Sequence, residues 1–377
     1  MQTKHKLSGL VLVFLLAITL VATLVGGSGI ASPVSQSPTD QTLYAGFSFP
    51  LEDNSDVSAI PVAKNSSYKD MKLYPGGVAF GVKFHTDGLI VIGFSDITDG
   101  SGRSNPAYDA GLREKDVIVK INGIAATGVS QLTEAVEGSS GGEITLTYRR
   151  AGRNHEAHVT PKYSSADGKY KTGLLIRDSG AGIGTVTYIN PETLSFGGLG
   201  HGICDGDTGE LIPMDRGSVL DVTISGITKG ASGAPGEIKG YFSGSKTGTV
   251  VSNTHCGVYG TFASLPENLP CEPLPVGTRD ELKEGDAYIY CTLDNGAPCR
   301  YTIKISDINL SATGNKCFTI KVTDKALIEK TGGIVRGMSG SPIIQNGKLV
   351  GAVTHVLVND STSGYGIFIE NMLSAGQ

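Results

Sequence analysis

The sequence predicts a mainly β protein in which an α+β domain is followed by an all-β domain. Glycine accounts for 53 of the 377 residues, tryptophan is absent, and the apolar content is ordinary. Such a composition favours many short strands joined by turns over long helices. The chain is longer than one ordinary domain, which agrees with more than one folded part.

Residues 1–28 are predicted to be a membrane anchor or signal segment. Lys4 and Lys6 precede an uncharged apolar run over residues 7–25. An apolar run of about 19 residues is long enough to cross a bilayer as a helix. Basic residues on its N-terminal side place that end inside and the rest of the chain outside. A signal peptide cleaved near Ala31 is the alternative, and both interpretations predict export of the folded domains.

Residues 29–70 are predicted to be a linker. They are rich in Ser, Pro, Asp and Asn and show little hydrophobic periodicity. Such a segment holds the folded domains away from the membrane.

Residues 71–162 are predicted to form the α+β domain. Strand-like apolar runs occupy 78–84, 89–94, 116–121 and 143–148. A short helical turn over 105–110 ends at Gly111. A second helix is indicated by Leu132 and Val136, which fall on one helical face.

The segment from Ala107 to Gly123 reads A-x-x-A-G-L-x-x-x-D-x-I-x-x-I-N-G and resembles a PDZ domain of the bacterial protease type. Such domains bind an extended peptide by adding it to a sheet edge. The resemblance implies a peptide groove between a glycine loop and the second helix, formed by Gly76, Gly77, Val78, Phe80, Leu132 and Val136. A glycine hairpin with a closed groove is the alternative.

Residues 163–377 are predicted to form an all-β domain of two barrels or a sandwich. Strand-like runs recur at 182–188, 219–224, 287–290 and 317–322, and about 200 residues of this kind suit such a fold. One short helix is expected over 325–330.

The run Gly337-Met338-Ser339-Gly340-Ser341-Pro342 contains the candidate nucleophile. A serine hydroxyl becomes reactive when a base takes its proton and donors hold the oxyanion that forms. The flanking glycines allow the backbone N–H groups of Gly337 and Ser339 to serve as those donors. Chymotrypsin-like serine peptidases present their nucleophile in this way, and a glycine-serine hairpin is the alternative.

The candidate base is His201, which lies in the glycine-rich segment 197–202. Its place before Ser339 matches the chain order of chymotrypsin-like enzymes. His255 and His355 are the alternatives, and His355 is expected to form a wall of the site. For the acid, Asp324 at the end of a strand competes with aspartates nearer the histidine, and spacing alone does not choose among Asp205, Asp207, Asp221 and Asp324.

Several functions are disfavoured. The net charge of −5 and the lack of a basic stripe argue against a general nucleic-acid binder. The sequence has no P-loop or dinucleotide-binding motif, so no cofactor is expected.

The six cysteines are predicted to be buried thiols or disulfides: Cys204, Cys256, Cys271, Cys291, Cys299 and Cys317. The sequence alone leaves their pairing open. A zinc site made by His201, Cys204, His255 and Cys256 is the alternative, but no C-x2-C pair supports it, and no metal is expected.

The chain resembles, over nearly its full length, the stage IV sporulation protein B peptidases of endospore-forming bacteria. The resemblance rests on the N-terminal apolar segment and on motifs at 75–77, 181–185, 198–208 and 336–342. It implies a serine endopeptidase in which His201, Asp324 and Ser339 are catalytic. The stretch from Cys256 to Cys317 is less similar to the family.

The resemblance also implies a role in sporulation. Such proteins are exported into the space between the forespore and mother-cell membranes. There they cut the extracytoplasmic part of a membrane-bound regulator of an intramembrane metalloprotease, which activates a late mother-cell sigma factor, and they cleave themselves near the N-terminus. The alternative is a non-catalytic exported PDZ scaffold that binds peptide termini.

Overall fold

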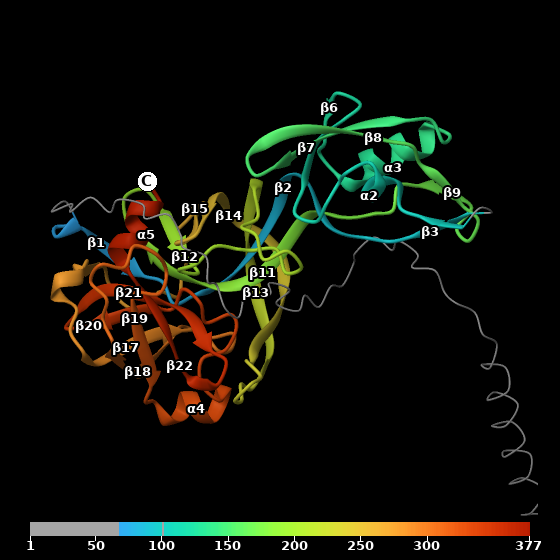
Figure 1. Cartoon of the computed structure of the whole chain (residues 1–377). Helices are drawn as coiled ribbons and strands as arrows, with labels where there is room; N and C mark the ends of the chain where they lie inside the picture. The colour runs from blue at the N-terminus through green and yellow to red at the C-terminus, as the bar shows by residue number, and fades with distance from the viewer. Residues whose placement is uncertain (1–67, 100–101) are drawn as a thin grey trace, which may run out of the picture. The chain divides into compact units, whose positions relative to one another are not determined.

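The structure is a computed structural model that describes residues 68–99 and 102–377 (Figure 1). The predicted membrane segment and nearly all of the predicted linker lie outside these residues. Within the described ranges, no helix is long and apolar enough to cross a membrane.

Six antiparallel strands form the first barrel of the all-β domain. Each strand pairs with the next, and β11 also pairs with β2, which closes the circuit. In spatial order they are β11 (Leu174–Ile189), β12 (Ser195–Gly198), β15 (Gly257–Phe262), β14 (Glu237–Thr254), β13 (Met214–Thr228) and β2 (Ala79–Phe94). The short strands β1 (Lys72–Pro75) and β16 (Leu274–Pro275) extend this sheet beside β11.

A second closed barrel follows in the C-terminal part, drawn in orange and red in Figure 1. Its strands are, in spatial order, β17 (Gly285–Cys291), β18 (Cys299–Ser306), β19 (Phe318–Val322), β22 (Asp360–Phe368), β21 (Lys348–Leu357) and β20 (Pro342–Gln345). The 3-10 turn η2 (Arg279–Glu281) precedes the barrel, α4 (Lys325–Thr331) follows β19 and α5 (Ile369–Ala375) ends the chain. The mainly β prediction is confirmed, and α4 lies where a short helix was expected.

The α+β part has its own hydrophobic core. Leu89, Leu112, Ile118, Leu132 and Leu146 are buried together in it. The core lies between helices and a sheet formed by α2 (Pro106–Asp109), β5 (Val117–Ile121), α3 (Val129–Gly138), β7 (Ile144–Arg150), β8 (Arg153–Val159) and the end of β2. Short strands complete it: β3 (Ile97–Asp99), β4 (Gly102–Ser104), β6 (Ile124–Ala125), β9 (Lys162–Ser164) and β10 (Lys169–Lys171).

Two strands of 16 residues, β2 and β11, belong to both folded parts. Residues 79–85 of β2 pair with residues 179–185 of β11 inside the first barrel, whereas Leu89 and Ile90 pair with β5 of the α+β part. At about 3.3 Å per residue, a strand of this length is longer than one small domain requires. The pairing therefore corrects the predicted domain boundaries of 71 and 162: residues 72–85 belong to the barrel, and residues 174–177 border the α+β core.

Candidate active site

Ser339 lies in a tight loop just before β20 and is buried, with 7% of its surface exposed. Gly337 and Gly340 on either side of it have φ values of +99° and +94°. Side chains with a Cβ rarely adopt this backbone conformation, so the two glycines are what allow the chain to turn here. The serine is thereby held at the tip of a sharply bent loop.

Two threonines of β11 bind the backbone carbonyls of this loop. The Thr185 amide donates to the Ser339 carbonyl at 3.0 Å, and its hydroxyl donates to the Gly337 carbonyl at 2.8 Å. The Thr187 hydroxyl donates to the Gly340 carbonyl at 2.8 Å. Thr185 and Thr187 are two residues apart on a strand, so both side chains leave it on the same face. Sequence reasoning missed them, because the groups that they bind lie 152 and 153 positions later in the chain.

The carbonyls of Arg336 and Met338 determine where the candidate oxyanion donors point. The Arg336 carbonyl accepts from the Ile238 amide at 2.9 Å. The Met338 carbonyl accepts from both the amide and the hydroxyl of Ser341, at 2.9 and 2.6 Å. In a planar trans peptide the following N–H points opposite to the carbonyl. The N–H groups of Gly337 and Ser339 are therefore turned away from these partners, as an oxyanion hole requires.

His201 follows β12 in a loop whose residues Leu199 and Gly200 both have positive φ. Its ring is buried, and Nδ1 lies 2.8 Å from the carbonyl oxygen of Gly202. A carbonyl only accepts hydrogen bonds, so Nδ1 of the neutral ring carries the proton. Nε2 then holds the lone pair, which is the tautomer that a general base needs.

The loop after β12 that holds His201 lies against the loop before β20 that holds Ser339, since a Cβ added to Gly340 would lie 2.5 Å from the Leu199 nitrogen. The Ser339 hydroxyl donates to the Thr354 carbonyl at 2.7 Å. A Cβ added to Gly200, next to His201, would lie 3.0 Å from the Thr354 side chain. The rings of His201 and His355 are 4.9 Å apart. Residues from opposite halves of the domain, His201, Ser339 and His355, are thus brought to one place, with His355 as a wall.

Burial keeps both histidines of this site neutral. It lowers the pKa of His201 to about 4, opposed by the hydrogen bond to the Gly202 carbonyl. The pKa of His355 is lowered well below its ordinary value by burial and by the nearby His201 and Lys316. A base with so low a pKa stays unprotonated, and ready to accept a proton, far into the acid range.

We therefore expect the acid limb of kcat/KM to have its midpoint near pH 4, not near the ordinary histidine value of about 6.5.

The same shift makes stability depend on pH, because the unfolded chain binds a proton at His201 below about pH 6.5 while the folded chain does not. The free energy of unfolding is therefore unaffected by this group above pH 6.5. It falls by about 3 kcal/mol as the pH is lowered from 6.5 to 4. Activity profiles and thermal unfolding across this range check both expectations, and a kinetic midpoint near 6.5 contradicts the first.

Asp324 serves as the N-cap of α4. Its Oδ1 accepts from the amides of Ala326 and Leu327 at 3.0 and 3.1 Å, and its Oδ2 accepts from the Thr302 amide at 3.3 Å. These bonds satisfy free N–H groups at the start of the helix. The structure thus gives the carboxylate a structural task, and its assignment as the acid of a triad stays a prediction.

An Asp324→Asn variant separates the two roles. Asparagine caps helices about as well as aspartate, so the free energy of unfolding is expected to change by less than ~0.5 kcal/mol. If the carboxylate only caps α4, kcat stays within about threefold of the parent value. Loss of a carboxylate that orients a catalytic histidine costs about 10⁴-fold in kcat. We expect the small effect, and a loss of that larger size would place Asp324 in the triad.

The aspartates nearer His201 in sequence have other partners. Asp205 is buried, pairs with Arg177 and accepts from the amides of Asp207 and Thr208 at 3.0 and 2.9 Å. Asp207 also pairs with Arg177, at 2.7 Å. These contacts hold the loop that follows His201.

The structure corrects the predicted peptide groove. The amides of Gly76 and Gly77 donate to the carbonyls of Thr187 and Val186 in the first barrel, at 2.9 and 2.8 Å. The Val78 carbonyl accepts from the Val186 amide at 3.0 Å. Phe80 is buried in the barrel core against Phe196. These four residues are engaged in barrel packing, so they cannot offer backbone groups to a peptide.

Leu132 and Val136 instead face the start of β11. A cavity of about 390 Å³ is lined by α3 and by residues 172–176, with Ser95–Ile97 nearby. Leu174 to Arg177 pair with β2 along one edge, and β12 and β1 join β11 only from Val186 onward. Among the described strands, the second edge of this stretch is therefore open, and the Leu175 side chain is 47% exposed.

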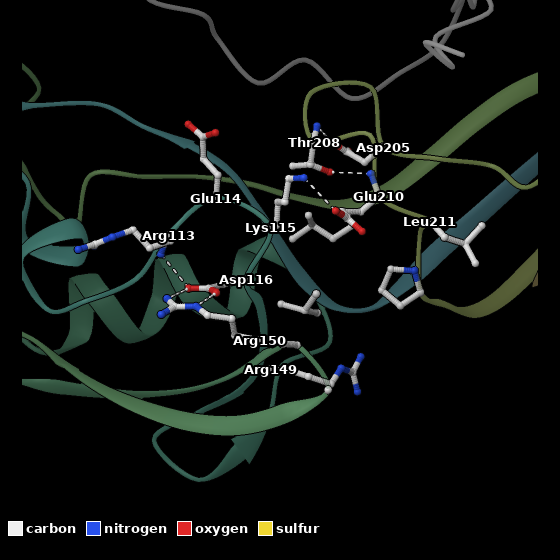
Figure 2. Close-up of a pocket in the computed structure, with 15 residues that line it drawn as sticks. Arg113, Glu114, Lys115, Asp116, Arg149, Arg150, Asp205, Thr208, Glu210 and Leu211 are labelled. Carbon is white, nitrogen blue, oxygen red and sulfur yellow. Dashed lines mark hydrogen bonds and ion pairs between the residues drawn. The ribbon is translucent and has the colours of Figure 1, made fainter. Parts of the chain in front are cut away.

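A second cavity lies beside β5 and the loop that follows His201 (Figure 2). Asp116 is buried in its wall, where it binds Arg150 through both carboxylate oxygens at 2.7 Å and accepts from the Arg113 amide. Lys115 and Glu210 pair across it at 2.9 Å, and both are exposed. These contacts are ion pairs that hold loops, and the lining contains no serine or histidine.

For the zinc alternative, the described part of the chain holds no group of three or more His, Cys, Asp or Glu side chains that could bind a metal ion. For His255, the alternative base, Asn315 donates to its backbone carbonyl at 3.0 Å.

Comparison with known proteins agrees with this picture. Residues 168–373 match the family SpoIVB peptidase S55, and residues 104–150 match the PDZ domain family. A putative zinc metalloprotease of Lactococcus lactis, LL2128, is 34% identical over 73 residues, which cover 19% of this chain and 17% of that protein.

Two solved structures are among those found. The active form of the Rv3671c protease from M. tuberculosis is 17% identical, covers 52% of this chain and 73% of its own, and has a TM-score of 0.30. The PDZ domain of the SdrC-like protein Lmo2051 from Listeria monocytogenes is 21% identical. The match covers 24% of this chain and 87% of that domain, with a TM-score of 0.20.

Two β barrels whose loops bring a serine and a histidine together define a trypsin-like serine peptidase, here combined with a PDZ domain. The match over more than half of the chain shows that the protein belongs to the SpoIVB peptidase S55 family. It is accordingly a serine endopeptidase.

Proposed function

We propose that this chain is an exported, membrane-anchored signalling endopeptidase of sporulation. Its substrate is the extracytoplasmic part of a membrane-bound regulator, and cutting it starts intramembrane proteolysis and activates a late mother-cell sigma factor. The chain also cleaves itself. The observation that carries the proposal is the meeting of the Ser339 and His201 loops at Thr354. The family match and the N-terminal apolar segment support the setting.

In the proposed mechanism, Ser339 attacks the carbonyl carbon of the scissile peptide bond. The serine hydroxyl rotates from the Thr354 carbonyl toward His201, whose Nε2 takes the proton and later gives it to the leaving amine. The amides of Gly337 and Ser339 hold the oxyanion. Water then hydrolyses the acyl-enzyme, and His201 acts as base a second time.

The PDZ part is proposed to hold the substrate as an added strand. The open edge of β11 at Leu174 to Ile176 offers backbone groups, and α3 supplies the apolar wall through Leu132 and Val136. An extended peptide binds such an edge by main-chain hydrogen bonds. The same strand continues to Thr185, which holds the nucleophile loop. One strand thus carries both the docking edge and a residue that binds the catalytic loop.

A Leu175→Arg variant tests this docking site. The purified parent chain is expected to cut the extracytoplasmic domain of the regulator at one or a few bonds. The variant should show a KM raised about tenfold for that domain, because a charge replaces the apolar surface under the added strand, while short peptides are cut at the parent rate.

Leu310 is 48% exposed and lies outside the cavity, so Leu310→Arg is the matched control and should leave KM unchanged. Equal KM values for Leu175→Arg and the parent would contradict docking at β11. If the parent chain leaves the regulator domain intact, the proposed substrate is wrong.

A further inference from the structure

Cys291 and Cys299 lie directly opposite each other where β17 and β18 join in a hairpin. Opposed residues on antiparallel strands have their Cα atoms about 4.5 to 5.5 Å apart. Disulfides span Cα separations of about 4.4 to 6.8 Å. Both residues are thiols in this structure, with Cys291 buried and Cys299 exposed. The register of the barrel thus supplies a pairing that the sequence alone leaves open.

The hairpin between the two cysteines contacts the first barrel. Thr292 donates to the Gly77 carbonyl at 2.9 Å. The Asn295 side chain accepts from the Ile224 amide at 2.7 Å and donates to the Ile224 carbonyl at 3.0 Å. Pro298 packs so closely on Gly77 that an added Cβ there would lie 3.0 Å from it. A constraint on this hairpin is therefore a constraint on how the two barrels are held together.

Cys291 is also close to the nucleophile loop. Its thiol interacts with the Ser341 hydroxyl, which in turn donates to the Met338 carbonyl at 2.6 Å. That carbonyl belongs to the peptide whose N–H is the Ser339 oxyanion donor. Burial raises the pKa of the Cys291 thiol, so this group stays protonated, and the exposed Cys299 is the one that an external oxidant meets first.

We propose that Cys291 and Cys299 form a disulfide that fixes the hairpin joining the two barrels. The Cys299 thiolate attacks a small-molecule disulfide and releases one thiol. Cys291 then loses its proton and attacks the Cys299 sulfur, which releases the second thiol. Two cysteine thiols and one external disulfide thus become one protein disulfide and two external thiols. The proposed export supplies only the oxidant, and the pairing depends on the proposed function in no other way.

Peptide mapping of the purified chain tests the pairing. The protein is equilibrated with oxidised glutathione, its remaining thiols are alkylated, and it is cut before Asp294, which lies between the two cysteines. Peptides holding Cys291 and Cys299 should stay joined until a reductant is added, and the reactive thiols should fall from six by two. Closing so short a loop should raise the Tm by about 5 °C over the reduced protein.

Cys299→Ser should abolish this rise in Tm, and its exposed position lets the variant fold. Cys271→Ser is the matched control and should keep the rise. Recovery of both cysteines as alkylated thiols, or a link from either one to another cysteine, would overturn the proposal. Labelling of Ser339 by a phosphonofluoridate in the same samples reports the peptidase separately, so a failed pairing is distinguishable from a failed enzyme.

Discussion

Replacing Ser339 by alanine is expected to abolish peptide cleavage, with kcat reduced by roughly 10⁵-fold to 10⁶-fold. The variant lacks the atom that attacks the substrate, and no other hydroxyl occupies its place on the loop. The fold should survive, because the hydroxyl makes one hydrogen bond in the resting protein, to the Thr354 carbonyl. Its loss changes the free energy of unfolding by about 1 kcal/mol.

A phosphonofluoridate probe measures the same change without a substrate, since it labels only an activated serine. The parent chain should be labelled at Ser339 and the Ser339→Ala chain should not be labelled. Ser341→Ala is the matched control, because this serine is also buried but its hydroxyl is bound to the Met338 carbonyl. The Ser341→Ala chain should still be labelled at Ser339, but the labelling reaction should be slower than in the parent chain. Cleavage by Ser339→Ala at the parent rate would rule the mechanism out.

The nucleophile and the base could be predicted from sequence because their signals are local. A serine between glycines and a histidine in a glycine turn are recognisable within six residues, and the chain order adds a second constraint. The supports of the loop are not local. Thr185 and Thr187 bond to residues 152 and 153 positions later in the chain, and no pattern within either segment announces such a contact.

The predicted groove illustrates a different failure. Gly76 and Gly77 precede an apolar run, as the loop of a PDZ groove does, but the same run is also what a barrel strand needs. The amides of both glycines donate to carbonyls of β11, so hydrogen-bond partners outside the segment determine that it joins the barrel and not a peptide groove. Asp324 differs, because an aspartate just before a helix suits both an N-cap and a catalytic acid: the contacts show the cap, and the catalytic role stays a prediction.

Replacing Gly340 by alanine is expected to remove nearly all activity without touching a reacting atom. An added Cβ would collide with the Thr185 carbonyl oxygen and lie 2.5 Å from the Leu199 nitrogen, two residues before His201. Both contacts are backbone atoms, which cannot rotate away as a flexible side chain can, so the nucleophile loop must move. A displacement of about 1 Å in a catalytic group costs roughly 100-fold in rate, and we expect a loss of at least that size.

Gly347→Ala separates this collision from the cost of a positive φ. Gly347 has a φ of +76°, close to the +94° of Gly340, but an added Cβ there meets nothing within 4 Å. Both variants therefore carry the conformational cost of about 1 to 2 kcal/mol, which thermal unfolding measures. Only Gly340→Ala should also lose activity and phosphonofluoridate labelling. Equal activity in the two variants would mean that the contact between the His201 and Ser339 loops does not position the nucleophile.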